Sequence, residues 1–334
     1  MSTDTDLYAR LESIFGARVQ RDVPLAPYTS ARVGGPADVL ITVHSARELA
    51  MVASRLWSWE VPFWVLGGGS NILVADEGVR GVVVLNRSRR LAFNTEGEQP
   101  TVWAESGVNL GSLARRAAAM GLAGLEWAAG IPGTVGGAVV GNAGAHGQEI
   151  ADVLQMAEIL HRTEGKGMRT PEALGYAYRT SALKEEPGQA VVLSATLRLQ
   201  HDTPEAVQER LAALNEQRKA TQPPGATVGS MFKNPPGDYA GRLIDAAGLK
   251  GTTVGDAEIS TVHANFFVNK GEATAQEIWA LMYLARTTVA QKFGVWLEPE
   301  IQLVGAWPEA AVAALYEPQE LPPPMPVPRP KEEA

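Results

Sequence analysis

The chain has 334 residues, a net charge of −8 at pH 7, 45% hydrophobic residues and 20% charged residues, which together indicate a soluble globular protein long enough for two or three domains. It contains no cysteine, and this excludes disulfides, thiolate nucleophiles and cysteine-ligated metal centres. The acidic balance argues against general affinity for nucleic acid, because such binding needs a cationic face, so an anionic ligand would need arginine or lysine placed locally.

Histidine spacing and the N-terminal sequence narrow the functional classes further. None of the five histidines has H-x-x-x-H spacing, so no histidine-based metal site is expected. Residues 1–12 lack the apolar core of a signal peptide, and no apolar run approaches the roughly 20 residues that span a bilayer. The sequence therefore predicts a cytoplasmic protein that binds neither membranes nor nucleic acid.

The first segment, residues 1–80, has the pattern of a compact β-α-β unit. Residues 38–43 are predicted to form a strand, and Ser45 with Glu48 three residues later is a capping box that opens a helix. The apolar face of that helix consists of Leu49, Val52 and Leu56. Residues 63–66 return as a strand that leads directly into a glycine run.

That run consists of Gly67, Gly68 and Gly69, followed by Ser70 and Asn71. Glycine permits positive φ and has no Cβ, so consecutive backbone N–H groups can converge on an anion. A Rossmann fingerprint would need a helix directly after the loop, but residues 72–76 have the pattern of a further strand. A single run of this kind could also be an ordinary tight turn.

The second segment, residues 81–202, carries another glycine-rich run at residues 130–138. The predicted elements around this run are strands at 81–85, 101–105, 153–161 and 190–199 and a helix over 110–120. Gly121 is expected to end that helix. Because both glycine runs are flanked by segments of buried character, we predict that they hold one pyrophosphate together and that the ligand is a dinucleotide.

A third domain is predicted over residues 203–305. It begins with a helix that has Pro204 at its first position, a site where the missing N–H of proline costs nothing. A second helix is predicted to start at the capping box of Thr274 and Glu277 and to stop at Gly294. A polar stretch rich in turn residues separates the two helices.

The remaining residues, 306–334, are predicted to form a C-terminal extension. Proline dominates residues 322–330, which favours polyproline II and prevents a packed core. We therefore expect a solvated tail, and no feature of the sequence supports a docking motif for a partner.

Five short motifs, spread through all three segments, form one ordered pattern with the two glycine runs. They are YTSARVGGPA (28–37), GNAGA (141–145), YRTS (178–181), GSMFKNP (229–235) and LEPE (297–300). In this order they resemble the UDP-N-acetylenolpyruvoylglucosamine reductase family, from about residue 20 to about residue 304. The resemblance implies an α+β fold: a two-subdomain FAD-binding module of the PCMH type, vanillyl-alcohol-oxidase-like, and a third α+β domain that binds the substrate.

The resemblance also implies an activity in peptidoglycan precursor synthesis. FAD, bound non-covalently, is reduced by NADPH and reduces the enolpyruvyl ether of a UDP-sugar. Ser230 matches the proton donor of the family, Arg179 matches the arginine that pairs with the substrate carboxylate, and Glu300 matches an acidic partner that retains its proton. Glu298, two residues away, would face the same side of a strand and is the alternative to Glu300.

Binding residues follow from the same resemblance. The cofactor residues it implies are Gly67, Gly68, Gly69, Ser70, Asn71, Gly130, Ile131, Pro132, Gly133, Thr134, Gly136, Gly137 and Ala138. The substrate residues it implies are Tyr178, Lys233, Asn234 and Lys219. Arg242, on a short predicted helix ending near Gly248, could contact either the flavin edge or a carboxylate such as Asp245.

One departure and two alternatives complete the sequence-based interpretation. Only residues 183–189 lie between the YRTS motif and the next strand, so the chain resembles the shorter branch of the family, which lacks a tyrosine-bearing substrate loop. Closure over the substrate is therefore expected to rely on motion of the third domain.

A different FAD-dependent oxidoreductase on the same scaffold is one alternative function, although the absence of cysteine and of histidine in both glycine loops speaks against covalent flavin. A catalytically silent flavin- or nucleotide-binding module is the other.

Overall fold

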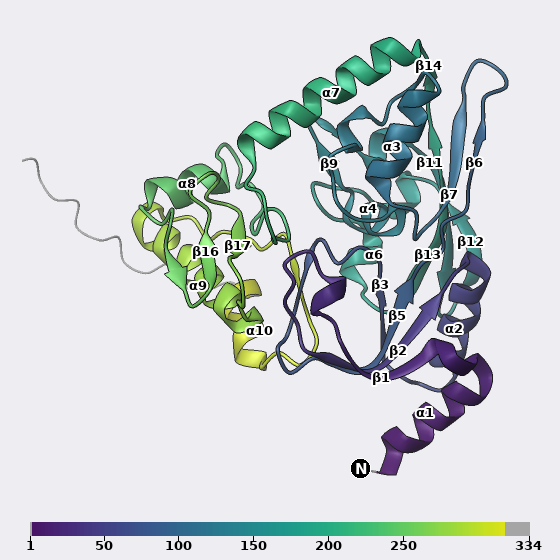
Figure 1. The fold of residues 1–334 in the computed structure, drawn as a ribbon, viewed down its shortest axis with the longest axis horizontal. Helices are drawn as coiled ribbons and strands as arrows, with labels where there is room; N and C mark the ends of the chain where they lie inside the picture. The colour runs from purple at the N-terminus through teal and green to yellow at the C-terminus, as the bar shows by residue number, and fades with distance from the viewer. Residues whose placement is uncertain (1, 318–334) are drawn as a thin grey trace, which may run out of the picture.

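The computed structural model describes residues 2–317, so the predicted proline-rich segment 322–330 lies outside the described residues. Two larger sheets lie on one side of the molecule, and a smaller body of helices and short strands lies on the other (Figure 1). The long helix α7 (Pro204–Thr221) connects them along one edge. Among residues 2–317 no helix is long and apolar enough to cross a membrane.

The first sheet has the strand order β1-β2-β5-β3. Its strands are β1 (Val19–Pro24), β2 (Pro36–Val43), β3 (Phe63–Leu66) and β5 (Val79–Asn86). β5 pairs parallel with both β2 and β3, as a β-α-β unit requires, and it runs across the predicted boundary at residue 80. β4 (Ile72–Val74) follows the first glycine loop as the predicted second strand.

Helix α2 (Ala46–Ser58) joins β2 to β3 and is capped by Ser45, whose side chain accepts from the N–H of Glu48. Its predicted face of Leu49, Val52 and Leu56 is buried. These side chains pack with Leu160 and Leu193 of the second sheet, so α2 lies between the two sheets. Helix α1 (Ser2–Phe15) covers the far edge of the same core through Leu11 and Phe15.

The second sheet is antiparallel, with the order β12-β11-β13-β7-β6. Its strands are β6 (Leu91–Asn94), β7 (Thr101–Glu105), β11 (Leu154–His161), β12 (Gly165–Arg169) and β13 (Ala190–Arg198). Helix α3 (Leu110–Ala119) stops before Gly121, whose φ of +68° is the left-handed value that glycine adopts freely. The predicted strands at 101–105, 153–161 and 190–199 and the helix over 110–120 are confirmed to within a few residues.

Short elements fill the connections of this second body. They are β8 (Leu122–Ala123), α4 (Val135–Gly141), β9 (Gly144–Ala145), β10 (Gln148–Glu149), α5 (Ile150–Val153), α6 (Ala182–Glu185) and β14 (Gln200–His201). α4 was not predicted from the sequence because its residues are mostly glycine and valine, which are poor helix formers. It forms because Thr134 caps its first turn and because Val135 and Val139 are buried in the core of this body.

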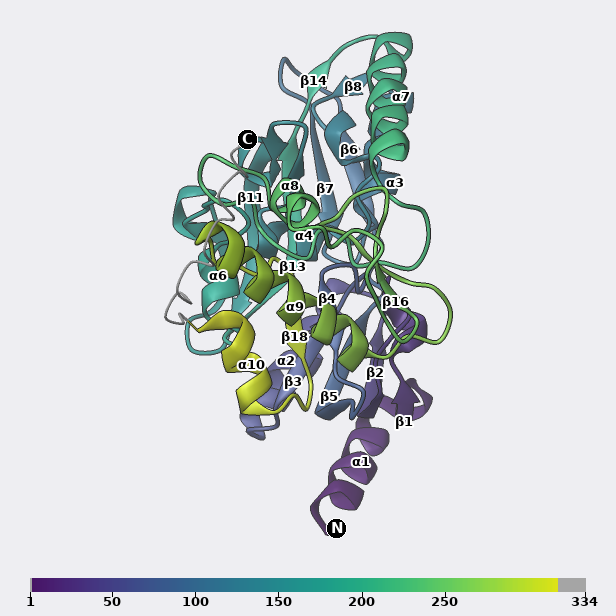
Figure 2. The same ribbon diagram turned by 90° about the vertical axis from the view of Figure 1, so that its left-hand side faces the viewer.

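The third body is built around helix α9 (Ala275–Phe293). The remaining elements are α8 (Ala240–Ala246), β15 (Thr253–Val254), β16 (Ala257–Ile259), β17 (Phe267–Asn269), β18 (Gln302–Val304) and α10 (Glu309–Tyr316). The capping box of Thr274 and Glu277 and the stop at Gly294, with φ +69°, are confirmed. Figure 2 shows α9 and β18 lying in front of the first sheet, where β18 pairs parallel with β4.

Candidate functional site

A cavity of about 490 Å³ lies where the three bodies meet. Both glycine loops line it, together with side chains from the second sheet and from the third body. Among the residues predicted from the sequence, those that line it are Gly67, Gly68, Gly69, Ser70, Asn71, Ile131, Pro132, Gly133, Thr134, Gly136, Gly137, Ala138, Tyr178, Arg179, Ser230, Asn234 and Glu300. The structure thus brings segments from the whole chain to one concave site.

The two glycine loops touch each other directly, and their glycines are required by this close approach. A Cβ on Gly68 would lie 2.8 Å from the Cα of Gly133. The hydroxyl of Ser70 donates to the carbonyl of Pro132 at 3.1 Å and ties the loops together. Larger residues at the contact points would force the loops apart, so the paired loops predicted from the sequence are a single structural unit.

Backbone donors remain free in this unit. Within residues 2–317, the N–H groups of Gly68, Gly69 and Ser70 donate to no protein acceptor. Gly69 has a left-handed φ of +61°, a backbone conformation that glycine adopts without strain. Consecutive free N–H groups beside a glycine-lined cavity are the arrangement that binds phosphate oxygens, so the site fits the diphosphate of a dinucleotide.

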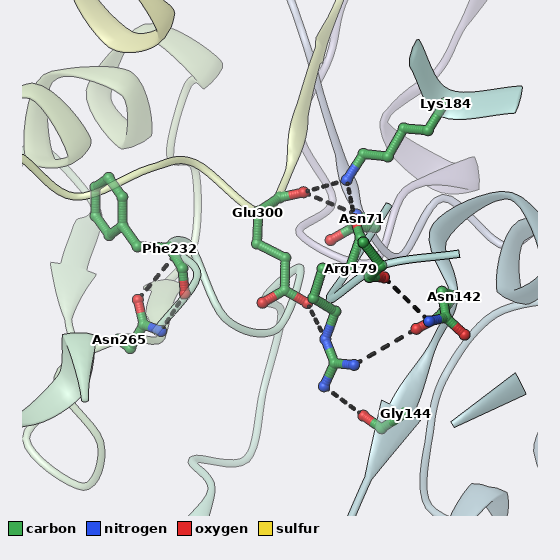
Figure 3. Close-up of polar contacts among 9 residues, drawn as sticks. Asn71, Asn142, Gly144, Arg179, Lys184, Phe232, Asn265 and Glu300 are labelled. Atoms are coloured by element: carbon green, nitrogen blue, oxygen red, sulfur yellow. Dashed lines mark hydrogen bonds and ion pairs between the residues drawn. The ribbon is translucent and has the colours of Figure 1, made fainter. Parts of the chain in front are cut away.

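A partly buried ion pair lies at the cavity. The Nε of Arg179 donates to Oε1 of Glu300 at 3.0 Å, and the rest of the guanidinium donates to the carbonyls of Gly144 at 2.6 Å and Asn142 at 3.5 Å (Figure 3). The side chains of Arg179 and Glu300 are only 19% and 18% exposed. Because these two residues come from different bodies, the pair joins the second sheet to the third body at the site.

Lys184 and Asn71 fix the backbone around this pair. Nζ of Lys184 donates to the carbonyl of Arg179 at 3.0 Å and to the carbonyl of Glu300 at 3.3 Å. The amide of Asn71, in the first glycine loop, donates to the same Glu300 carbonyl at 3.1 Å. Arg179 itself has a φ of +60°, a left-handed conformation uncommon for a residue with a side chain. The hydrogen bond from Lys184 helps to hold this unusual turn in place.

Burial controls the electrostatics of the pair. Burial raises the pKa of Glu300, and the nearby charges of Arg179 and Lys184 offset this only in part. Burial also lowers the pKa of Lys184, with the charge of Lys233 acting in the same direction. Glu300 therefore keeps its proton more readily than an exposed carboxyl group does. The sequence-based expectation was a Glu300 that retains its proton.

Ser230 lies in a segment of the third body that is held on both sides by hydrogen bonds. Asn265 accepts from the N–H of Phe232 at 3.0 Å and donates to the carbonyl of Phe232 at 2.8 Å (Figure 3). On the other side the N–H of Glu300 donates to the carbonyl of Met231 at 2.9 Å. These bonds place Ser230 next to the Glu300 segment, so all three predicted catalytic residues line the same cavity.

Several predicted residues do not line the cavity, and their charged groups have other partners. Lys233 forms an ion pair with Glu298 at 2.6 Å, and Lys219 forms one with Glu216 at 2.7 Å. Arg242 binds Asp238 rather than Asp245, with Nε to Oδ1 at 2.6 Å. The residues of the predicted set outside the cavity are Gly130, Lys233 and Lys219.

Glu298 and Glu300 are clearly separated. The two residues flank Pro299, which forms an isolated antiparallel bridge with Phe232. Glu298 is 66% exposed and paired with Lys233, whereas Glu300 lines the cavity. Of the two carboxyl groups, that of Glu300 is the one at the cavity.

Sequence reasoning missed several cavity residues. Lys184 lies in the short connection 183–189, whose length was its only informative feature in the sequence. Asn265 lies in no recognised motif. Arg218 and Gln222 also line the cavity, at the end of α7. The spacing of apolar residues predicts the helix α7, but it does not indicate that the last turn of this helix lines a cavity. Within residues 2–317 no group of three or more His, Asp or Glu side chains could hold a metal ion.

Comparison with known protein families gives two matches along the chain. Residues 37–170 match the FAD binding domain family, and residues 220–304 match the C-terminal domain of UDP-N-acetylenolpyruvoylglucosamine reductase. The first match contains both glycine loops, and the second contains Ser230 and Glu300. The predicted FAD-binding fold and the separate third domain of a reductase agree with these matches.

Individual relatives extend the similarity over nearly the whole chain. The UDP-N-acetylenolpyruvoylglucosamine reductase of Rubrobacter xylanophilus is 47% identical over 296 residues, covering 88% of this chain and 98% of the relative. That of Chloroflexus aggregans is 46% identical over 284 residues, covering 84% and 96%. The crystal structure of the Thermus caldophilus enzyme is 40% identical, with a TM-score of 0.73 over 86% of this chain and 99% of that chain. The chain belongs to the UDP-N-acetylenolpyruvoylglucosamine reductase family.

Proposed function

We propose that the chain reduces the enolpyruvyl ether of UDP-N-acetylglucosamine enolpyruvate to UDP-N-acetylmuramate, with NADPH as reductant, in peptidoglycan precursor synthesis. The observation that carries this proposal is the convergence of the paired glycine loops, the Arg179–Glu300 pair and Ser230 on one cavity. The free N–H groups of the first loop fit the diphosphate of FAD. FAD, when bound there, supplies the hydride chemistry between NADPH and the substrate.

Three residues of the chain would stabilise charge and transfer a proton during the reaction. Arg179 is held at the cavity wall by two backbone carbonyls, so its guanidinium is oriented before substrate arrives and can stabilise the negative charge that grows on the substrate carboxylate. Glu300, with its pKa raised by burial, can share a proton with the same region. Ser230 would donate a proton to the substrate carbon, a role that a weak acid can fill when it is held in place.

Substrate binding is assigned to Asn234 and Tyr178. Asn234 lines the cavity, and its side-chain oxygen already accepts from the N–H of Ala240 at 3.1 Å, so its amide NH₂ is the group left to face the ligand. Tyr178 lines the cavity and is 47% exposed, and the centroid of its ring lies 5.0 Å from Cζ of Arg179. The domain limits 1–80, 81–202, 203–305 and 306–334 and a cytoplasmic location remain predictions.

An anaerobic experiment tests the function. Purified protein loaded with FAD is mixed with NADPH and then with UDP-N-acetylglucosamine enolpyruvate, while the flavin absorbance is followed. Bleaching by NADPH and recovery on addition of the enolpyruvyl sugar support the proposal. Bleaching without recovery would indicate another FAD-dependent oxidoreductase, and no bleaching would indicate a flavin-binding module without turnover.

A further inference from the structure

The helix α10 lies beyond the part of the chain that matches the reductase family, because that match ends at residue 304. It lies beside α9 in both views of the fold (Figure 1, Figure 2). Leu315 of α10 is fully buried in the core of the third body. The indole of Trp279, in α9, donates to the carbonyl of Ala311 at 3.1 Å. α10 is therefore packed into the third body, although the family match does not include it.

A buried arginine connects the end of α10 with the LEPE motif. Arg286 of α9 is only 4% exposed, and its guanidinium donates to the carbonyls of Ala314 at 2.9 Å and Glu317 at 3.1 Å. Its Nε donates to the carbonyl of Leu297, the first residue of the motif, at 3.1 Å. A cation is favourable at the carbonyl end of a helix, so Arg286 fixes the end of α10 beside the LEPE segment.

Tyr316, the last residue of α10, occupies the free edge of β18. On the other edge β18 pairs with β4, where the N–H of Gln302 donates to the carbonyl of Asn71 at 3.0 Å. Backbone groups alternate along a strand, so the carbonyl of Ile301 and the N–H of Leu303 face away from β4. The hydroxyl of Tyr316 donates to that carbonyl at 2.7 Å and accepts from that N–H at 3.3 Å. One side chain thus bonds this edge as a neighbouring strand would.

The Tyr316 hydroxyl is suited to a lasting role as donor. Burial raises the pKa of Tyr316 to about 12, so the hydroxyl keeps its proton at neutral pH. The residue as a whole is nevertheless 42% exposed. A phenylalanine therefore fits in the same place, and the hydroxyl can be removed without leaving a cavity in the core.

The bond from Tyr316 acts on the peptide group next to Glu300. The backbone of Glu300 itself is held by Met231, whose carbonyl accepts from its N–H at 2.9 Å, and by Asn71 and Lys184, which donate to its carbonyl. Tyr316 adds a restraint one residue later, on the side away from β4. Since the Glu300 side chain reaches the cavity from this backbone, a small rotation of the strand would displace its carboxyl group.

We propose that Tyr316 is a positioning residue for the reaction: its hydroxyl holds the strand next to Glu300 and thereby fixes where the Glu300 carboxyl group lies. α10 then serves the site as well as the core. Tyr316 does not line the cavity, so it acts through Glu300 and takes no part in proton transfer. The inference rests on the proposed function, because it requires that Glu300 takes part in the reaction.

Kinetics of the two half-reactions on FAD-loaded protein test the proposal. In Tyr316→Phe we expect reoxidation of the flavin by the enolpyruvyl sugar to slow by about 3- to 10-fold, because one neutral hydrogen bond that orients Glu300 is lost. Reduction by NADPH should stay nearly unchanged. A merely structural role would lower the melting temperature and slow both half-reactions alike, and that result overturns the proposal.

Tyr283→Phe is the matched control. It is the same chemical change on the neighbouring helix α9, at a residue that is 40% exposed. The Tyr283 hydroxyl forms no hydrogen bond within residues 2–317. The control should match the wild type in both half-reactions, and a slowing of reoxidation equal to that of Tyr316→Phe overturns the proposal.

Hydrogen exchange, followed by mass spectrometry, tests the contact without turnover. In Tyr316→Phe the segment 301–304 should exchange about 5-fold faster or more, because the N–H of Leu303 has lost its acceptor. Helix α2, far from the substitution in the fold, serves as the internal reference. Faster exchange without slower reoxidation overturns the proposal, and so does slower reoxidation without faster exchange.

A second variant approaches the same contact from α9. Trp279→Phe removes the donor to Ala311 and keeps an aromatic ring beside α10. We expect it to change exchange in 301–304 and reoxidation in the same direction as Tyr316→Phe, and by less, because the Tyr316 hydroxyl is still present. Slower exchange or faster reoxidation in this variant would count against the proposal.

Failure of the proposal can be told apart from failure of the proposed function. A wild type whose flavin is not reoxidised by the enolpyruvyl sugar overturns the function, and the role of Tyr316 in the reaction falls with it. A wild type that turns over normally, while Tyr316→Phe is reoxidised equally fast, overturns only the role of Tyr316.

Discussion

The third body meets the two sheets through junctions of opposite chemistry. At the first sheet, β18 pairs with β4 in parallel register, and Leu73 of β4 is buried in the same core as Phe232 and Leu281 of the third body. At the second sheet, the described contacts at the cavity are polar: the Arg179–Glu300 pair and the hydrogen bond from Lys184. At the first sheet the third body shares strand pairing and a hydrophobic core. At the second sheet it is joined by charged and polar groups around the cavity.

Further polar contacts strengthen the first junction. The carboxylate of Asp76 accepts from the N–H groups of Ala275 at 2.8 Å and Gln276 at 2.9 Å, at the N-terminus of α9. The indole of Trp307 donates to the carbonyl of Leu73 at 3.3 Å. β18 and α9 are thus attached to the first sheet by strand pairing, a shared core and hydrogen bonds. We expect the domain motion of substrate closure to occur at the polar junction and α7.

Removing Ser230, which lies on the fixed body but faces the cavity, should give the largest effect on activity. In Ser230→Ala we expect reoxidation of the flavin by the enolpyruvyl sugar to slow by about 10²- to 10⁴-fold, because a general acid is lost, with reduction by NADPH nearly unchanged. Rapid mixing of each half-reaction measures this. Equal slowing of both half-reactions would remove Ser230 from the acid role.

Arg179→Lys tests the polar junction. An ammonium cannot reproduce the guanidinium contacts with Glu300 and the two backbone carbonyls, so we expect kcat to fall by about 10²- to 10³-fold. The melting temperature should change little, because the sheet and core of the other junction are untouched. Near-normal turnover, or a large loss of stability, would contradict the view that the polar junction serves activity and the first-sheet junction serves stability.

Asp76→Ala tests the fixed junction. Loss of the carboxylate leaves two N–H groups of α9 without their acceptor, and we expect the free energy of unfolding to fall by about 1–2 kcal/mol. Thermal and denaturant unfolding measure it. Glu77→Ala is the matched control, since its side chain forms no hydrogen bond or ion pair in the described residues. Equal effects of the two substitutions would mean that the cap contributes nothing.

The smallest effect should be a pH dependence of stability from Glu300. Its pKa is raised in the folded protein, so its contribution to stability is fully present below the ordinary value of 4.5 and is lost as the pH rises through the raised value. The difference in unfolding free energy between wild type and Glu300→Gln should therefore decrease with rising pH. A difference that grows with pH would refute the assignment.

Local chemistry explains what could be predicted from the sequence. The need for glycine at Gly68 and Gly133 follows from backbone geometry, and the ends of α9 follow from Thr274 and Gly294, so short-range patterns placed the loops and the helix correctly. Ser230, Arg179 and Glu300 were found because each lies in a motif that resembles the family. Their convergence on one cavity followed from the resemblance and not from any local pattern.

Long-range pairing explains what could not be predicted. Lys233 has the right charge for a diphosphate, but its ion pair with Glu298, 65 positions away, appears only once the chain is folded. Lys219 pairs with Glu216 one helical turn earlier and stays exposed. Arg218, the neighbour of Lys219 in sequence, lines the cavity, and its side chain forms no hydrogen bond or ion pair within residues 2–317. Whether a charge is available to a ligand depends on burial and on competing partners, and the sequence alone specifies neither.

The parallel pairing of β18 with β4 has a consequence for biosynthesis. Asn71 and Glu300, which it brings together, are 229 positions apart, so their contact closes a very long loop and must form late. A ribosome has to release nearly the whole polypeptide before this pocket can exist. Incomplete chains that lack β18 would therefore leave the edge of β4 without its parallel partner, and an unpaired strand edge invites aggregation and capture by chaperones.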